Sequence, residues 1–175
     1  MTRSHRALWF VAFTIAVGVA GCRDTAPGSA LGPQAPPVSD PAALFGDLTL
    51  LSCTPYAADS ASALIGPEGG SIDVGPHRFV VPAGALDSAV TITAVAPSGP
   101  VNVVRFSPDG LRFDRPATLV MSYANCGLVT WIIPRRIVQV DGALEILQVL
   151  PSLTDYWHLQ TRARLEHFSD YAVAW

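Results

Sequence analysis

The sequence of 175 residues contains no lysine, and its eleven basic residues, all arginines, are outnumbered by fourteen acidic ones. Two of the arginines, Arg3 and Arg6, lie close to the N-terminus, so the rest of the chain is more acidic than the formal net charge of −3 indicates. Nucleic-acid binding needs clustered positive charge, so we expect no nucleic-acid partner. A mildly acidic surface favours solubility and does not identify another partner.

Motifs of phosphate binding, metal binding and hydrolysis are also missing. The glycine-rich stretch GPEGG at 66–70 is not followed by the Gly-Lys-Ser/Thr that grips phosphate and Mg²⁺. There is no Gly-x-Ser-x-Gly elbow and no Cys-x-x-Cys pair. Beyond His5, the histidines (His77, His158 and His167) lack the spacing of metal ligands. We therefore expect no cofactor, no metal site and no metabolic enzyme.

The apolar run near the N-terminus is too short for a permanent membrane span. It extends from Ala7 to Ala20, after Arg3, His5 and Arg6. As a helix it would be about 21 Å long, against a hydrocarbon core of roughly 30 Å. A basic flank followed by a short apolar run is typical of a secretory signal, which we place at residues 1–21.

The run ends in Val19-Ala20-Gly21-Cys22, which resembles the bacterial lipoprotein box. The resemblance implies cleavage before Cys22, diacylglycerol on the Cys22 sulfur and acylation of the new amino group. More than one acyl chain would make a stable anchor. We expect a lipid-anchored, extracytoplasmic protein of the bacterial cell envelope. The alternative is an ordinary signal peptide with a cysteine near its cleavage site.

A linker follows the anchor, over residues 22–43. It is rich in proline, glycine, alanine and serine and has no apolar periodicity, so we expect it to be flexible and disordered. A chain of this length spans roughly 25 Å, enough to hold a domain clear of the bilayer.

Residues 44–175 are expected to form one all-β domain. Short apolar or alternating segments are separated by glycine and proline turns, without long helical periods. The Asp141-Gly142 pair between two such segments predicts a hairpin. The polar stretch 54–63 looks like a turn, and 151–160 is ambiguous and compatible with a short helical turn. This pattern predicts an antiparallel β-sandwich, with a closed barrel as the alternative. Strands are expected near 48–51, 71–74, 78–81, 89–96, 101–106, 111–113, 118–123, 137–140, 144–149, 162–165 and 167–175.

Two segments of this domain carry a family resemblance. The first is GGSIDVGPHRFVVPAGAL, with the corner Val81 to Ala85, and the second has the spacing Pro108, Gly110, Phe113 and Pro116. Over residues 65–125 the chain resembles the ZU-type domain shared by zona occludens proteins, netrin receptors and ankyrins. The resemblance implies a β-sandwich and a role in scaffolding or protein contact. The whole layout is similar to bacterial envelope lipoproteins that carry such a domain.

Cys53 and Cys126 remain once Cys22 is assigned to lipid. Two cysteines in an exported domain favour one disulfide, which would join the first apolar segment to the end of the 118–123 strand. The alternative is a pair of buried, unpaired thiols.

The tripeptide His167-Phe168-Ser169 matches the site at which some proteins with ZU-type domains cleave themselves. The match implies that the Ser169 hydroxyl attacks the Phe168 carbonyl, that His167 accepts its proton, and that water hydrolyses the resulting ester. In an extended strand His167 and Ser169 would lie about 6.6 Å apart, so contact needs a local bend. The alternative is a plain terminal strand in which Phe168 packs inward.

Three functions therefore remain open at this point. The first is a membrane-tethered module that binds a protein or surface partner, and the second is a self-cleaving module. The third is a carbohydrate-binding envelope domain, for which the chain offers Trp131, Trp157 and Trp175 outside the signal. Exposed, coplanar indole rings would favour the third function.

Overall fold

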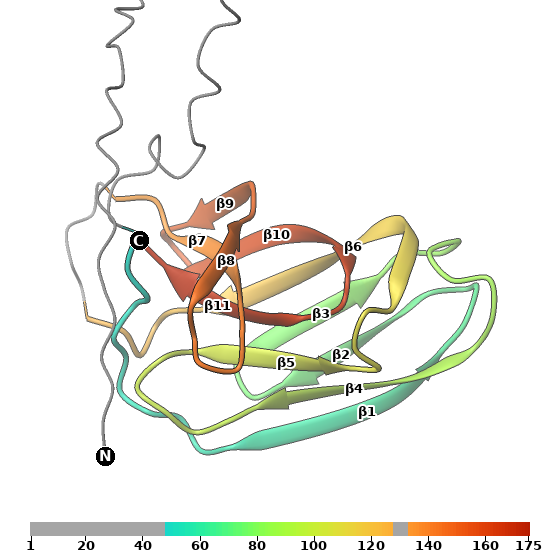
Figure 1. Ribbon diagram of the computed structural model, residues 1–175, viewed down its shortest axis with the longest axis horizontal. Helices are drawn as coiled ribbons and strands as arrows, with labels where there is room; N and C mark the ends of the chain where they lie inside the picture. The colour runs from blue at the N-terminus through green and yellow to red at the C-terminus, as the bar shows by residue number, and fades with distance from the viewer. Residues whose placement is uncertain (1–47, 128–132) are drawn as a thin grey trace, which may run out of the picture. The chain divides into compact units, whose positions relative to one another are not determined.

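The computed structural model describes residues 48–127 and 133–175, which form strands and the turns between them (Figure 1). Within these ranges no helix is long and apolar enough to span a membrane. The predicted signal peptide (1–21), Cys22 and the linker (22–43) lie outside the described residues, as does Trp131.

The strands form two antiparallel sheets. In spatial order, the six-stranded sheet consists of β1 (Asp59–Ile65), β4 (Val90–Ala96), β5 (Val103–Ser107), β11 (Asp170–Ala174), β7 (Arg136–Val140) and β8 (Ile146–Val149). The five-stranded sheet consists of β2 (Gly70–Val74), β3 (His77–Val81), β6 (Arg112–Ser122), β10 (Gln160–His167) and β9 (Ser152–Asp155).

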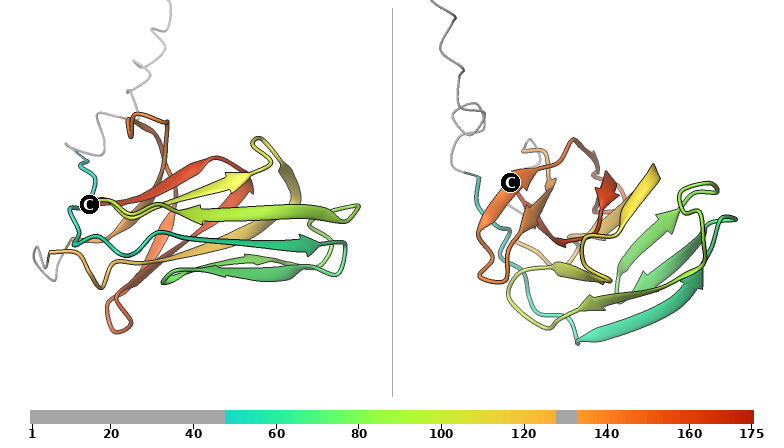
Figure 2. Two further views of the ribbon diagram at one scale, coloured as in Figure 1. Left: turned by 90° about the horizontal axis from the view of Figure 1, so that it is seen from below. Right: turned by 45° about the vertical axis from the view of Figure 1, so that its right-hand side comes forward.

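The two sheets pack face to face, which confirms the predicted β-sandwich (Figure 2). Strands that turn one face to the core, such as β2, β3 and β10, bury alternate residues, as the pleat requires, whereas β11 is buried on both faces. In β3, for example, His77, Phe79 and Val81 are buried while Arg78 is exposed.

Aromatic rings from both sheets meet at the centre of the core. Phe79 and Phe113 come from the five-stranded sheet, whereas Phe106 comes from the six-stranded sheet. Phe168, which follows β10, stacks on Phe106 with ring centroids 4.7 Å apart and lies 5.4 Å from Phe79 and 5.1 Å from Phe113. A single ring therefore contacts strands of both sheets.

The glycine pair and the corner noted in the sequence lie against each other. The Gly84 N–H donates to the Pro67 carbonyl at 2.7 Å, and the Gly69 N–H donates to the Gly66 carbonyl at 2.9 Å. Gly69 has φ 78°, and a Cβ there would lie 2.5 Å from the Val81 carbonyl oxygen. Only glycine fits this position. The glycines around 65–86 therefore let the turn between β1 and β2 pack closely against the chain that leaves β3.

Local structure differs from the prediction at several places. The strand expected near 48–51 is only an isolated bridge between Leu50 and Ala174. Residues 59–63 belong to β1, an edge strand whose residues are mostly exposed, rather than to a turn. The ambiguous stretch 151–160 contains β9, a turn at 156–159 and the start of β10. The two segments at 111–113 and 118–123 form one strand, β6, which continues through Pro116.

His77 is the one buried histidine among the described residues, with 3 % of its surface exposed. Its Nδ1 accepts a hydrogen bond from the Ser122 N–H at 3.1 Å, so the ring is neutral and carries its proton on Nε2. Burial lowers the pKa of His77 to about 4, because the charged ring would lose its hydration.

We expect the free energy of unfolding to fall as the pH drops from 6.5 towards about 4, since in that window unfolded His77 binds a proton and folded His77 does not. The shift corresponds to about 3 kcal/mol. Chemical denaturation across this pH range measures it, with His77→Asn as the comparison, whose amide oxygen can replace Nδ1 as acceptor.

The pKa of Asp170 is raised, chiefly by burial, and its contribution has the opposite sign because folded Asp170 binds its proton more readily. The wild type and His77→Asn both contain Asp170. The difference between the pH dependences of their unfolding free energies therefore comes from His77. Equal pH slopes in the wild type and His77→Asn would contradict the prediction.

Candidate functional site

The His167-Phe168-Ser169 tripeptide lies where the chain crosses from the five-stranded to the six-stranded sheet. β10 ends at His167 after a register shift between Leu165 and His167, and β11 begins at Asp170. Phe168 and Ser169 are the two residues that connect the strands. Phe168 is 1 % exposed and points into the core, as the alternative reading also expected.

The Phe168 peptide is held by the loop before β6. Its N–H donates to the Leu111 carbonyl at 2.8 Å, and its carbonyl accepts from the Gly110 N–H at 3.3 Å. Gly110 has φ 73°, a conformation that glycine adopts without strain. The His167 Nδ1 lies 3.1 Å from the same carbonyl oxygen. Because that oxygen only accepts, the contact requires a proton on Nδ1.

The Ser169 hydroxyl accepts a hydrogen bond from the Gln139 Nε2 at 3.0 Å. Within the described residues no hydrogen bond joins it to His167. The structure therefore places His167 at the carbonyl that would be attacked and Gln139, which the sequence did not single out, at the hydroxyl that would attack.

Tyr171 and Asp170, at the start of β11, hold the chain that follows the tripeptide. The Tyr171 hydroxyl donates to the His167 carbonyl at 2.7 Å, and burial raises the pKa of this phenol far above its usual value of 10. Asp170 lies 3.3 Å from the Arg105 Nε across the β5–β11 pair. Burial raises the pKa of Asp170, and the Arg105 charge opposes that shift.

Cys53 and Cys126 form a disulfide, with the two sulfur atoms 2.07 Å apart. They face each other in an antiparallel bridge, flanked by hydrogen bonds from Thr54 to Asn125 and from Gly127 to Ser52. This pairing was predicted from the sequence. It joins the segment before β1 to the segment after β6.

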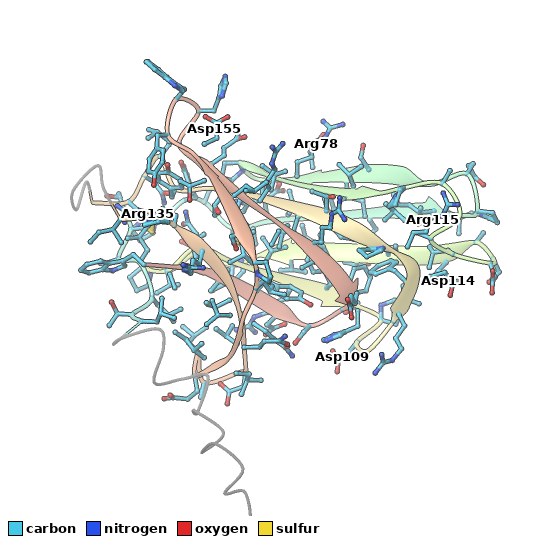
Figure 3. All side chains as sticks on the ribbon, turned by 90° about the horizontal axis from the view of Figure 1, so that it is seen from above. Arg78, Asp109, Asp114, Arg115, Arg135 and Asp155 are labelled. Atoms are coloured by element: carbon cyan, nitrogen blue, oxygen red, sulfur yellow. A yellow bond between two sulfur atoms is a disulfide. The ribbon has the colours of Figure 1, made fainter. Side chains whose placement is uncertain are left out.

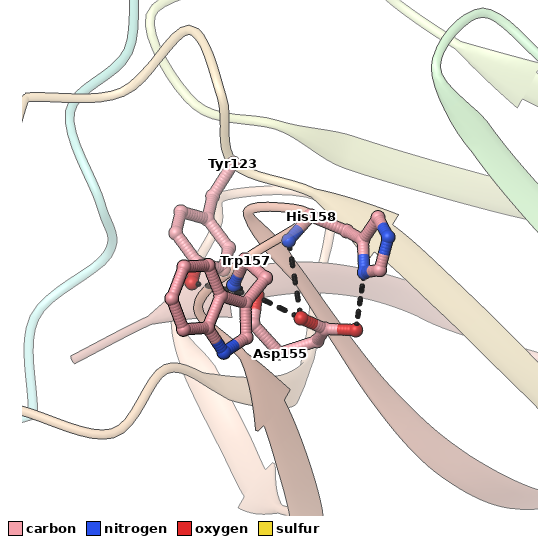
Figure 4. Close-up of polar contacts among 4 residues, drawn as sticks. All are labelled: Tyr123, Asp155, Trp157 and His158. Carbon is pink, nitrogen blue, oxygen red and sulfur yellow. Dashed lines mark hydrogen bonds and ion pairs between the residues drawn. The ribbon is translucent and has the colours of Figure 1, made fainter.

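A second polar cluster, which the sequence analysis missed, lies in the β9–β10 turn (Figure 4). The Asp155 carboxylate accepts the Trp157 N–H at 3.0 Å and the His158 N–H at 3.1 Å, and its other oxygen lies 2.7 Å from the His158 Nδ1. The hydrogen bond from the His158 side chain is the main cause that lowers the pKa of Asp155. The Asp-x-x-His spacing, an Asx-turn pattern, was the signal available in the sequence.

Tyr123 anchors both ends of this turn. Its hydroxyl donates to the Asp155 carbonyl at 3.2 Å, and its N–H donates to the Leu159 carbonyl at 2.8 Å. Trp157, in the middle of the turn, is 95 % exposed and Tyr156 is 43 % exposed. The turn thus presents a large aromatic side chain from a fixed backbone.

The other tryptophan in the described ranges, Trp175, packs against the core, so the two indoles form no shared platform. The histidines are dispersed as well: His77 is buried, His158 lies in the β9–β10 turn and His167 lies at the crossover. Among the described residues, no three histidine, cysteine or acidic side chains are grouped so that they could hold a metal ion.

No protein-family model matches the chain, and no curated protein matches it. The candidate sites are therefore argued from the geometry above.

We expect the double variant Cys53→Ala, Cys126→Ala to unfold more easily than the wild type. The disulfide joins residues separated by 73 positions in the sequence, and closing a loop of that length in the unfolded chain is worth about 4 kcal/mol on a chain-entropy model. Denaturant titration measures the loss, and reduction of the wild type should produce a loss of similar size. A thiol titration of unreduced, unfolded Cys22→Ser protein that finds two free thiols would contradict the pairing.

Proposed function

We propose that the chain is an exported bacterial lipoprotein, anchored through lipid on Cys22, whose β-sandwich works at the cell envelope as a binding module and not as a metabolic enzyme. The N-terminal signal and the lipoprotein box support the anchor. The sandwich of two antiparallel sheets agrees with the fold that the ZU-type resemblance implies, and that resemblance supports a role in contact with a protein or a surface partner.

The observation that carries the binding role is the β9–β10 turn. Trp157 is almost fully exposed, although burial of a tryptophan is strongly favourable in water. Aromatic side chains on a rigid backbone lose little conformational entropy when a partner covers them. Asp155 and Tyr123 supply that rigidity through the hydrogen bonds described above.

We expect the wild-type protein to fractionate with membranes and its mass to include the acyl chains on Cys22. The Cys22→Ser variant should lack the mass of the acyl chains. That unlipidated protein should still bind isolated envelopes, and adding Trp157→Ala should weaken the binding at least about tenfold, as for an aromatic hot spot.

Leu64→Ala is the matched control, because Leu64 is 70 % exposed but lies on β1 of the other sheet. If Trp157→Ala and Leu64→Ala weaken envelope binding equally, the β9–β10 turn is not the binding site. A wild-type protein whose mass includes no acyl chains would rule out the lipid anchor on Cys22.

The geometry at Phe168 favours a second candidate function, self-cleavage between Phe168 and Ser169. The Phe168 carbonyl oxygen has two donors directed at it, the Gly110 N–H and the His167 Nδ1. The Gly110 N–H can stabilise the negative charge that develops on this oxygen when a nucleophile adds to the carbonyl, and the neighbouring His167 ring is the nearest imidazole to the reacting bond.

In this candidate reaction the Ser169 Oγ adds to the Phe168 carbonyl carbon and its proton passes to the His167 imidazole after the ring leaves the carbonyl oxygen. The C–N bond then breaks, and the nitrogen of Ser169 takes up the proton. The product is an ester, which water hydrolyses to the Phe168 carboxylate and the Ser169 hydroxyl.

We expect a fragment from Ser169 to Trp175 in the mass spectrum of denatured wild-type protein and its absence from Ser169→Ala. Denaturation is necessary because β11 lies between β5 and β7, where the interior would retain a cut strand. His167→Asn should slow the appearance of the fragment. A wild-type protein that stays uncut, like Ser169→Ala, would end this candidate.

A further inference from the structure

A groove of about 490 Å³ crosses the outer face of the five-stranded sheet along β10. Its walls include Thr118, Leu153, Arg162 and Arg164. A smaller hollow of about 160 Å³ shares Leu153 and Arg162 with it and extends to Asp155, the last residue of β9 before the exposed turn. The two hollows therefore lead from the middle of the sheet towards the base of that turn.

Strand register accounts for the two arginines on one face. Arg162 lies between Val120 of β6 and Leu153 of β9, and Arg164 lies opposite Thr118 of β6. Alternate residues of a strand point to the same side, so both arginine side chains project outward from backbone positions about 6.6 Å apart along β10. Leu153, which is 64 % exposed, supplies an apolar wall beside them.

Two arginines give the larger groove its charge. Arg78, on the same outer face and labelled in Figure 3, is paired with Asp73 at 3.3 Å, and Asp155 lies 2.7 Å from the His158 Nδ1. Among the ion pairs of the described residues, none includes Arg162 or Arg164. No acidic residue lines the larger groove, although Glu166 is the next outward residue of β10. The chain as a whole carries a net charge of −3.

We propose that this groove binds an acidic polysaccharide, with sugar carboxylates on Arg162 and Arg164 and a sugar ring against the Trp157 indole. This inference rests on the proposed binding function and specifies its ligand class. Guanidinium groups form paired, charge-assisted hydrogen bonds with carboxylates. An exposed indole offers the flat apolar face on which the C–H face of a sugar ring packs.

Charge and shape together favour an acidic glycan over other anions. Nucleic acid needs many more cationic contacts than these two arginines provide. An acidic peptide would satisfy the arginines, but it would give the protruding Trp157 no specific partner. A neutral glycan would stack on Trp157 and leave Arg162 and Arg164 without a role.

The test uses full-length Cys22→Ser protein and three soluble polymers: polygalacturonate, neutral dextran and poly-glutamate. Titration calorimetry should show binding of polygalacturonate that weakens with added salt. The double variant Arg162→Gln, Arg164→Gln should bind at least about tenfold more weakly, as should Trp157→Ala. Arg78→Gln is the matched control on the same sheet face and should bind like the starting protein.

Three results would overturn the inference. The first is dextran binding as tight as polygalacturonate binding with no effect of the arginine variants. The second is tight poly-glutamate binding that Trp157→Ala leaves unchanged, which would indicate an acidic peptide. The third is a protein that binds isolated envelopes through Trp157 but does not bind polygalacturonate. In that case the proposed binding function would stand and the acidic polysaccharide would be the wrong ligand.

Discussion

The contact on which the rest of the structure depends is the packing of the Phe168 ring between the two sheets. It stacks on Phe106 of one sheet and touches Phe79 and Phe113 of the other. A buried ring also carries its own peptide group into the interior, where an unpaired N–H or carbonyl would be costly. Leu111 and Gly110 supply the partners, so the hydrophobic core itself sets the position of the Phe168 carbonyl.

That constraint also fixes the peptide at which the candidate self-cleavage is proposed. The loop that pairs with Phe168 takes the place of regular strand pairing at the end of β10, where the register shifts. Tyr171 then ties the start of β11 back to His167. The hydrogen bonds that pair the buried peptide groups at 167–168 would also orient the Phe168 carbonyl for attack. The same contacts therefore serve stability and the candidate reaction.

Sequence reasoning found the fold class, most strands and the disulfide, because alternation, glycine–proline turns and the cysteine pair are local or compositional signals. It missed β1, whose inward face consists of the small residues Ala61 and Ala63 before Ile65, and β9, which is too short for a period. It singled out His167 and Ser169 but not Gln139, and it named Gly110 for its spacing and not for its contact with Phe168, because both contacts form only through tertiary packing. It also missed the groove, since Arg162 and Arg164 acquire their neighbours from β6 and β9.

β10 contributes residues to both candidate sites, at opposite ends and on opposite faces of the strand. It begins at Gln160, next to the turn of Trp157, and ends at His167, so its ends lie roughly 23 Å apart at 3.3 Å per residue. Its outward residues line the groove, whereas its inward residues Ala163 and Leu165 belong to the core beneath Phe168. A ligand on the outer face therefore acts on the opposite side of the strand from the crossover chemistry. The two roles can be separated by substitution because a strand presents alternate residues to different environments.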